Sequence, residues 1–262
     1  MSSKLVDRLS QRLYADAPTD AQILDSLIRT YLSAGQRILD LGCGSGRLFP
    51  YDYRGDHRQV VGVDVDPAVS RNGRVSSGVR ASAYHLPFRD EAFDIVYSRY
   101  VFEHLERPRE AFGEIARVLR PGGITIILTP NKAHYVALIS RFTPHWFHRF
   151  VNEKLRGRPA EETFPTVYRA NTRRALNALA RSAGLEPAQV RMVELRPNYL
   201  MWGVLPFLLG VAYERLVNST AWLEDLRVNI VAAYRKPGSR GGQARPAVQA
   251  RAVARGGGTS PS

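Results

Sequence analysis

Three glycines and two aspartates in the first quarter of the chain have the spacing of a nucleoside-binding site. The segment ILDLGCGSGR carries Asp40 and then glycines at 42, 44 and 46, and the next apolar run, VVGVDVDP, ends in Asp64. A turn without side chains lets backbone N–H groups approach a ligand at the start of a helix. An acid at the tip of the following strand can accept hydrogen bonds from both ribose hydroxyls. The pattern therefore predicts that a nucleoside cofactor binds here.

The spacing of the glycines distinguishes between cofactors. A dinucleotide site needs the pattern G-x-G-x-x-G, whereas in this chain the third glycine comes one residue early and Arg47 stands at the dinucleotide position. A phosphate-binding P-loop is also excluded, because neither Lys-Ser nor Lys-Thr follows the glycines. The spacing favours a ligand that has a ribose but no pyrophosphate.

These segments resemble motif I and the acidic second-strand motif of class I S-adenosylmethionine-dependent methyltransferases. HLPFRDEAFDIVYSRYVFEHLERP (residues 85–108) and ARVLRPGGITIILTPN (residues 116–131) are similar to the later parts of the same domain, so the resemblance runs from about Gln36 to Asn131. Beyond the motifs, the chain looks like bacterial methyltransferases of the type-11 group, some of which act on small molecules or glycoconjugates. The resemblance implies S-adenosyl-L-methionine as the cofactor.

The resemblance also implies a role for individual residues. Asp40 would hold the amino group of the cofactor, the glycine loop would lie beside its methionine part, and Asp64 would bind the ribose. Ser82 stands where many members of the family have an Asp that accepts from the adenine amino group, so this contact would lack charge assistance. The predicted cofactor-binding set is Asp40, Gly42, Cys43, Gly44, Gly46, Asp64, Val65, Ser82, Ala83, Ser98 and Arg99.

Methyl transfer from a sulfonium is an in-line displacement, for which alignment of the two reactants supplies much of the catalysis. A general base adds to the rate when the acceptor is a hydroxyl. His104 and His134 are the predicted catalytic residues, because both follow strands whose ends should face the cofactor. His145 and His148 are further candidates by residue type. For each histidine, the alternative is a packed side chain with a structural role.

Alternating strand and helix patterns must position these residues. Buried, β-branched runs predict strands near residues 37–42, 59–64, 79–82, 93–98 and 123–129. Helical spacing and capping residues predict helices over 21–32, 108–119 and 172–183, the second of which should stop at Pro121-Gly122-Gly123. Two late runs, 189–195 and 228–234, predict an antiparallel pair. The predicted class is α/β: a Rossmann-like, seven-stranded class I methyltransferase sheet with helices on both faces.

The predicted organisation adds three parts to this domain of residues 36–236. Residues 1–35 form an N-terminal helical cap, residues 131–170 an inserted helical substrate lid, and residues 237–262 a disordered basic tail. The insertion mixes aromatic and basic residues, which suits an anionic acceptor such as a nucleotide sugar or a lipid-linked saccharide, and equally suits a solvated basic face. The N-terminus is interrupted by charges and lacks the pattern of a signal peptide, and Cys43 is the single cysteine, so we expect a cytoplasmic protein without disulfides.

One apolar segment, residues 197–227, has two interpretations. Its first part, Pro197–Tyr213, contains no charge, is short for a membrane span and is interrupted by Pro206. It predicts either a buried helix that covers the active site or a peripheral membrane contact, which the formal net charge of +13 would favour through anionic lipids.

The predicted function is methyl transfer to a small-molecule or glycoconjugate acceptor, with oxygen as the atom methylated. An RNA or nucleic-acid methyltransferase is an alternative, because arginines in the tail could bind phosphates. The strand end Tyr97-Ser98-Arg99-Tyr100 lacks the Asn/Asp-Pro-Pro-aromatic tetrad for base amines, and no second cysteine is present for carbon-5 chemistry. Both absences argue against nucleic acid as a partner. A protein that binds S-adenosylmethionine without catalysis is the third alternative.

Overall fold

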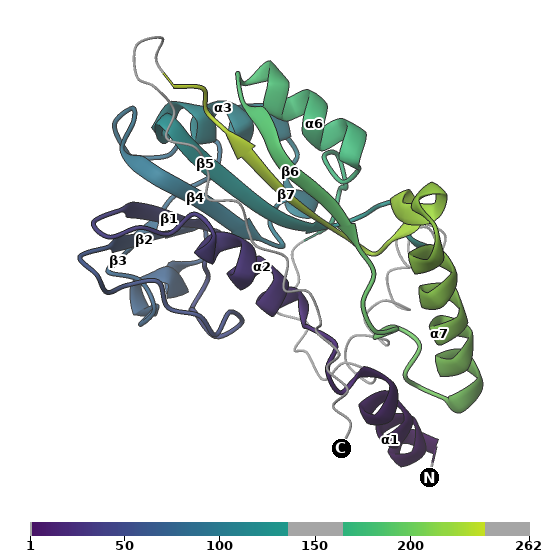
Figure 1. Cartoon of the computed structure of the whole chain (residues 1–262). Helices are drawn as coiled ribbons and strands as arrows, with labels where there is room; N and C mark the ends of the chain where they lie inside the picture. Colours follow the sequence, from purple (N-terminus) through teal and green to yellow (C-terminus); the bar gives the residue numbers. More distant parts are fainter. Residues whose placement is uncertain (1, 136–164, 239–262) are drawn as a thin grey trace, which may run out of the picture.

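The centre of the molecule is a seven-stranded sheet in the order β3-β2-β1-β4-β5-β7-β6 (Figure 1). The computed structural model describes residues 2–135 and 165–238. The strands are β1 (Arg37–Leu41), β2 (Gln59–Asp64), β3 (Ser77–Arg80), β4 (Phe93–Arg99), β5 (Leu119–Pro130), β6 (Glu186–Val193) and β7 (Asn229–Arg235). Among the strands of the described residues, β7 runs opposite to the others, so it pairs antiparallel with both β5 and β6. The predicted α/β class, with its late antiparallel pair, is confirmed.

The register of the sheet brings the ends of β1, β2 and β4 to one edge. Asp40 is level with Gly62 on one side and with Tyr97 on the other, and Leu41 is level with Ser98. The runs are apolar and are buried on both faces, as expected for central parallel strands. Side chains that follow these strands therefore meet where ligands bind in open α/β sheets.

Different helices cover the two faces of the sheet (Figure 1). On one face α2 (Asp20–Arg29) packs Leu24 and Ile28 into the cluster around Ile38 and Tyr97. A capping box begins this helix, because the Thr19 side chain accepts from Gln22 N and the Gln22 side chain accepts from Thr19 N. On the other face α3 (Pro108–Val118) and α6 (Arg173–Ser182) bury their apolar stripes in the second cluster.

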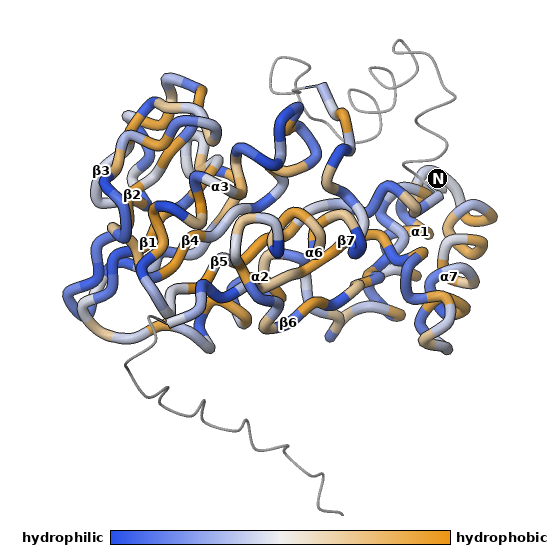
Figure 2. Tube along the Cα trace, turned by 90° about the horizontal axis from the view of Figure 1, so that it is seen from above, coloured by the Kyte–Doolittle hydropathy of each residue, from blue (hydrophilic) through white to orange (hydrophobic). Residues whose placement is uncertain are grey.

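A pair of helices stands apart from this core. α1 (Ser2–Tyr14) packs on α7 (Val204–Ser219) beyond one end of the sheet, and both views of the chain show the pair there (Figures 1 and 2). The Tyr14 hydroxyl donates to Glu214 Oε2 at 3.0 Å, next to a small apolar cluster of Val6, Tyr14 and Phe207. In the described ranges, 2–135 and 165–238, no helix is both long and apolar enough to cross a bilayer.

The structure differs from the sequence-based expectation at two strands. β3 occupies 77–80, two residues earlier than predicted. β5 begins at Leu119 and runs through Pro121-Gly122-Gly123, where the sequence predicts a turn. Gly122 N donates to Lys236 O and Lys236 N donates to Gly123 O, both at 2.9 Å, so pairing beyond β7 holds these glycines in the sheet.

Parts of the predicted organisation lie outside the described residues. They include most of the expected lid, with His145 and His148, and nearly all of the expected C-terminal tail.

Candidate active site

The glycine loop after β1 is fixed by backbone geometry that excludes side chains. Gly42, Gly44 and Gly46 all have positive φ angles, of 78°, 49° and 77°. A Cβ atom on Gly42 would collide with the Val101 side chain, and one on Gly46 would collide with the amide group of Asn72. Gly42 N donates to Val63 O at 2.7 Å, which ties the loop to β2. The loop therefore holds this shape only with glycine at these positions.

Gly44 is the glycine of the loop at which an added Cβ atom would have space. The nearest atom to a Cβ on Gly44 is Asp64 Oδ2, at 3.9 Å. Asp64 is held by two backbone donors, since Gly44 N donates to Oδ2 at 2.7 Å and Asp66 N donates to Oδ1 at 2.9 Å. Each carboxylate oxygen can accept a further hydrogen bond. The geometry leaves Asp64 fixed in orientation and able to accept two hydroxyl groups.

Two residues that the sequence analysis missed brace the loop from below. Asn72 Nδ2 donates to the carbonyl oxygens of Cys43 (3.3 Å) and Gly44 (3.2 Å). Arg74 donates from Nε to Gly46 O at 3.0 Å, and its backbone N–H donates to Asn72 Oδ1 at 2.9 Å. No sequence motif marks either residue. Their only signal is polarity directly after the short helix η1 (Pro67–Arg71), whose Asp66 cap follows Asp64.

Cys43 faces inward from the loop toward β2. A Cβ on Gly62 would come within 2.6 Å of its Sγ, so the glycine in β2 makes room for the thiol. Burial raises the pKa of the Cys43 thiol to about 12, and the nearby charge of Asp40 adds to the effect. The thiol thus stays protonated at neutral pH and packs as a small apolar group.

Asp40 and Ser98 place buried polar groups at the ends of β1 and β4. Burial raises the pKa of the Asp40 carboxyl to about 7; a hydrogen bond with Tyr97 opposes the rise, and the charge of Asp64 adds to it. Ser98 Oγ is buried and has no hydrogen-bond partner among residues 2–135 and 165–238. A cationic group beside Asp40 would favour its ionised form. The edge between β1 and β4 therefore fits a ligand that carries an ammonium group.

The Arg99 side chain is held by contacts within the protein. Its guanidinium pairs with Asp20 at the start of α2 (2.9 Å) and donates to Leu48 O at 3.1 Å, while it lies 4.8 Å from the centre of the Tyr100 ring. This places Arg99 as a brace between α2 and the chain after the glycine loop. It closes one side of the site.

The predicted adenine side lies at the ends of β2 and β3. Val65 is 49% exposed, and its carbonyl oxygen accepts from Arg80 Nε at 3.0 Å. Ser82 Oγ accepts from Tyr84 N at 3.3 Å, and Ala83 is buried beside it. The hydroxyl of Ser82 retains its own proton and one lone pair for a ligand.

A buried polar chain lines the other side, at the ends of β4 and β5. Thr129 Oγ1 donates to Glu103 Oε2 at 3.0 Å, and Asn171 Nδ2 donates to Thr129 Oγ1 at 2.6 Å. Glu103 lies in the short helix η2 (Phe102–His104), and its carbonyl oxygen accepts from Val167 N and Tyr168 N. Burial raises the pKa of Glu103 to about 7, against the hydrogen bond from Thr129 and the charge of Arg99.

The two predicted catalytic histidines occupy different surroundings. The His104 side chain is 28% exposed; its Nδ1 lies 2.9 Å from Pro165 O and its Nε2 lies 3.9 Å from Glu103 Oε1. The His134 side chain is 2% exposed, packs between the rings of Tyr135 and Tyr213, and lies 3.5 Å from Glu194 Oε2. His104 borders the open edge of the sheet, whereas His134 is enclosed where β5 meets α7.

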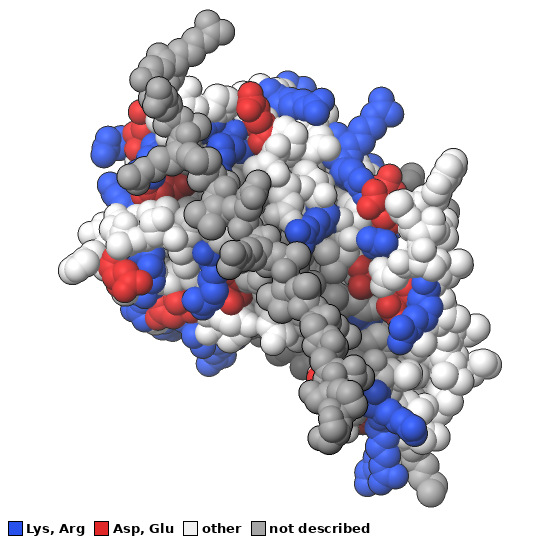
Figure 3. Space-filling view, in the orientation of Figure 1, with Lys and Arg blue, Asp and Glu red and all other residues white. Residues whose placement is uncertain are grey.

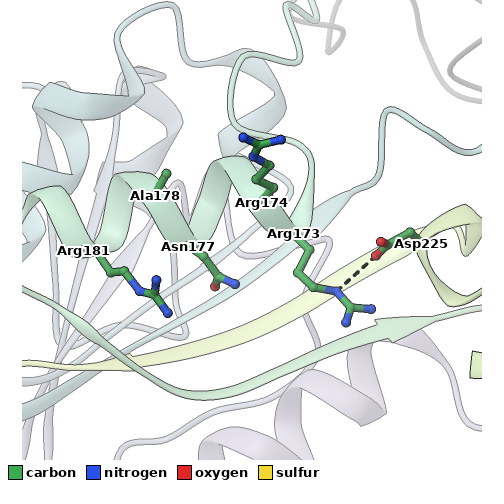
Figure 4. A pocket seen from close by; sticks show the side chains of 6 residues that line it. All are labelled: Arg173, Arg174, Asn177, Ala178, Arg181 and Asp225. Atoms are coloured by element: carbon green, nitrogen blue, oxygen red, sulfur yellow. Dashed lines mark ion pairs between the residues drawn. The ribbon is translucent and has the colours of Figure 1, made fainter.

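Two hollows lie on the surface. One of about 560 Å³ adjoins the glycine loop and is lined by Ser45, Arg47, Asp66, Ala68 and Arg71. The other, of about 470 Å³, runs along α6, where Arg173 pairs with Asp225 and Arg174 and Arg181 extend from the same helix (Figure 4). Neither hollow is lined by any of the predicted site residues, although the first lies next to them. Within the described part of the chain, no group of His, Cys, Asp and Glu could hold a metal ion.

Comparison with known proteins identifies the central part of the chain. Residues 39–127 match the family model of a methyltransferase domain. An uncharacterized methyltransferase of Mycobacterium marinum is 36% identical over 137 residues, which are 48% of this chain and 53% of that protein. The chain thus spans about half the length of the curated relatives it matches.

Solved structures agree on the fold. A SAM-dependent methyltransferase of Methanosarcina mazei has a TM-score of 0.53 at 20% identity, over 81% of this chain and 98% of that one. The cyclase SpnF has a TM-score of 0.54 at 21% identity, over 84% of this chain and 82% of that one. The chain therefore has the fold of class I methyltransferases, which a cyclase shares.

Proposed function

We propose that this chain, which carries a class I methyltransferase domain, transfers a methyl group from S-adenosylmethionine to a hydroxyl of a small-molecule or glycoconjugate acceptor. The observation that carries the proposal is the glycine loop, closed to side chains at Gly42 and Gly46 and open at Gly44 above the fixed carboxylate of Asp64. The matching domain supports the same cofactor class.

The residues of the edge fit this cofactor group by group. Asp64 would accept the two ribose hydroxyls, because each of its oxygens has one backbone donor and spare acceptor capacity. Asp40 would bind the amino group, and an ammonium there would return the pKa of the carboxyl toward its usual range. Ser98 Oγ would gain the partner that it lacks in the described protein. When bound, the cofactor supplies an activated methyl group.

His104 is the residue we propose as general base. A carbonyl oxygen can only accept a hydrogen bond, so the contact with Pro165 O places the proton of the neutral ring on Nδ1. Nε2 is then the basic nitrogen. Nε2 would take up the proton of the acceptor hydroxyl as that oxygen is methylated. Glu103, 3.9 Å away, would stabilise the resulting imidazolium.

His134 takes a structural role in this proposal. Its enclosed ring lies against two tyrosines and Glu194, and Glu194 also accepts from Val228 N at 2.7 Å. These contacts join the end of β5 to α7 and to the start of β7. The proposal therefore separates the two histidines that sequence analysis treated alike.

Transfer of a labelled methyl group to a panel of nucleotide sugars and polyprenyl-linked saccharides tests the activity. Once an acceptor is found, we expect His104→Asn to lower the turnover number by about a hundredfold or more, with little change in cofactor affinity. His134→Asn should instead lower the unfolding midpoint.

Equal loss of turnover in both variants would contradict the assignment of the base. Cofactor binding without transfer to any acceptor would favour a protein that binds S-adenosylmethionine without catalysis. Since a cyclase shares the fold, the acceptor assay, rather than the fold, decides the reaction.

A further inference from the structure

Helix α7 turns its leucines away from the protein. Four of them lie on one face at helical spacing and are 69%, 47%, 60% and 57% exposed: Leu205, Leu208, Leu209 and Leu216. The opposite face, which is buried, carries Phe207, Gly210, Glu214 and Val217. Large exposed apolar patches on a protein mark interaction sites. Of the two interpretations that the sequence left open, a fully buried helix is excluded, because α7 is buried on one side only.

Specific contacts hold the helix in this orientation. The inward Glu214 accepts from the Tyr14 hydroxyl at 3.0 Å and from Asn218 Nδ2 at 2.7 Å. A Cβ on the inward Gly210 would come within 2.5 Å of Pro197 Cβ, so only glycine allows this approach. Turning the leucines inward would break the hydrogen bond from Tyr14 to Glu214 and move Gly210 off Pro197. The packing of α7 therefore keeps its leucine face exposed.

Tryptophans stand at both ends of the leucine face. Trp202, just before α7, is 58% exposed, and Trp222, just after it, is 94% exposed. Exposed Trp rings are costly in water but are favoured at the level of lipid headgroups, where an apolar ring with one N–H donor is accommodated. Their position at the two ends of one helix is typical of a helix that lies in a membrane interface.

The exposed charges on the same helix pair are mainly positive, with Asp7 on α1 as the exposed acid. Lys4, Arg8 and Arg12 are exposed on α1, and the Arg215 side chain on α7 is 65% exposed. Figure 3 shows Lys and Arg gathered over the lower end of the molecule, where α1 lies, next to a mostly uncharged surface over α7. Anionic headgroups attract basic side chains that flank a buried apolar face.

We propose that α1 and α7 form a docking surface for an anionic lipid bilayer, with α7 lying in the plane of the interface. Its 16 residues extend about 24 Å, which is shorter than the hydrocarbon core, so the helix lies on the membrane and does not cross it. A second copy of the chain fits the charges less well, because a symmetric pair would bring the basic rims of both copies together. This inference is independent of the proposed reaction.

Sedimentation of the full chain with vesicles tests the surface. We expect binding to vesicles of phosphatidylcholine with phosphatidylglycerol, and binding weaker by about tenfold to phosphatidylcholine alone. The variant L205N/L209N should bind the anionic vesicles about tenfold more weakly, whereas L205M/L209M, which stays apolar, should bind like the parent. R8Q/R12Q should weaken binding, and R174Q/R181Q on α6 should leave it unchanged.

Two further measurements keep the outcomes distinct. Affinity for S-adenosylhomocysteine should be equal in the parent chain and in every variant, which shows that the fold of the sheet is intact. Vesicle binding that is absent in the parent, or equal in L205N/L209N, would overturn the proposal. A parent chain that is dimeric by light scattering, becomes monomeric in L205N/L209N and ignores vesicles would overturn it in favour of a second copy.

Discussion

The two sides of the sheet's carboxyl edge are built in different ways. On the cofactor side, the glycine loop and Asp64 are fixed by backbone N–H donors from within two adjoining segments. On the other side, at the ends of β4 and β5, Glu103, Thr129 and Asn171 come from three separate segments and hold one another through side chains. The first arrangement depends mainly on backbone conformation, with the Asn72 and Arg74 side chains as braces, and the second depends on the identity of single side chains.

The two sides should therefore respond differently to substitution. The glycine-loop side tolerates little change at its glycines and is braced by the Asn72 and Arg74 side chains. A side-chain-built half can be altered one residue at a time without disturbing the loop. Substitutions at Glu103 should change the pH dependence of stability, whereas substitutions in the glycine loop should change cofactor affinity.

The largest expected effect is on the pH dependence of stability, through Glu103. The pKa of Glu103 is raised to about 7 in the folded chain, so between pH 4.5 and 7 the folded state keeps a proton that the unfolded state releases. The unfolding free energy should therefore fall as the pH rises through this window, by roughly 3 kcal/mol from this group.

Urea unfolding of Glu103→Gln at several pH values checks the prediction. The variant should lack this loss, while the contribution of Asp40, also raised to about 7, remains in both chains. Glu110→Gln, on the surface of α3, is the control and should follow the parent. Parallel stability curves for the parent and Glu103→Gln would show that Glu103 is ionised in the folded chain.

The second effect concerns the loop. Gly46→Ala should weaken binding of S-adenosylhomocysteine by about a hundredfold, because the new methyl group collides with Asn72 at a residue with positive φ. Gly184→Ala is a matched control, with a φ of 76° and nothing within 4 Å of the added carbon. It should lose stability but no affinity. Equal affinity in the two variants would mean that backbone shape does not control the cofactor side.

The smallest expected effect is the release of a proton when the cofactor product binds. With a pKa of about 7, Asp40 is mostly protonated at pH 6, and an ammonium bound beside it should release that proton. Titration of the cofactor product in buffers with different ionisation enthalpies should show release of somewhat less than one proton at pH 6, and Asp40→Asn should abolish it. Release that persists in Asp40→Asn would place the ammonium elsewhere.

The same contrast decides what the sequence could predict. The strands and the Asp40–Gly46 loop were predictable because buried apolar runs and glycine spacing are local signals. Asn72 and Glu103 were not, because their roles depend on partners that folding brings together. For the apolar segment 197–227 the sequence left a buried helix and a membrane contact both open, because the face that α7 exposes depends on contacts such as that with Tyr14, about two hundred residues away. The length of β5 depends likewise on pairing with Lys236.

Calorimetric titration with S-adenosylhomocysteine, with NADH as the control ligand, tests the central claim most directly. The account predicts micromolar binding of S-adenosylhomocysteine, no binding of NADH, and at least about tenfold weaker binding of the first ligand by Asp64→Ala, which removes a charged acceptor of two hydroxyls. Binding of NADH alone, or affinity for S-adenosylhomocysteine that is unchanged in Asp64→Ala, would contradict it.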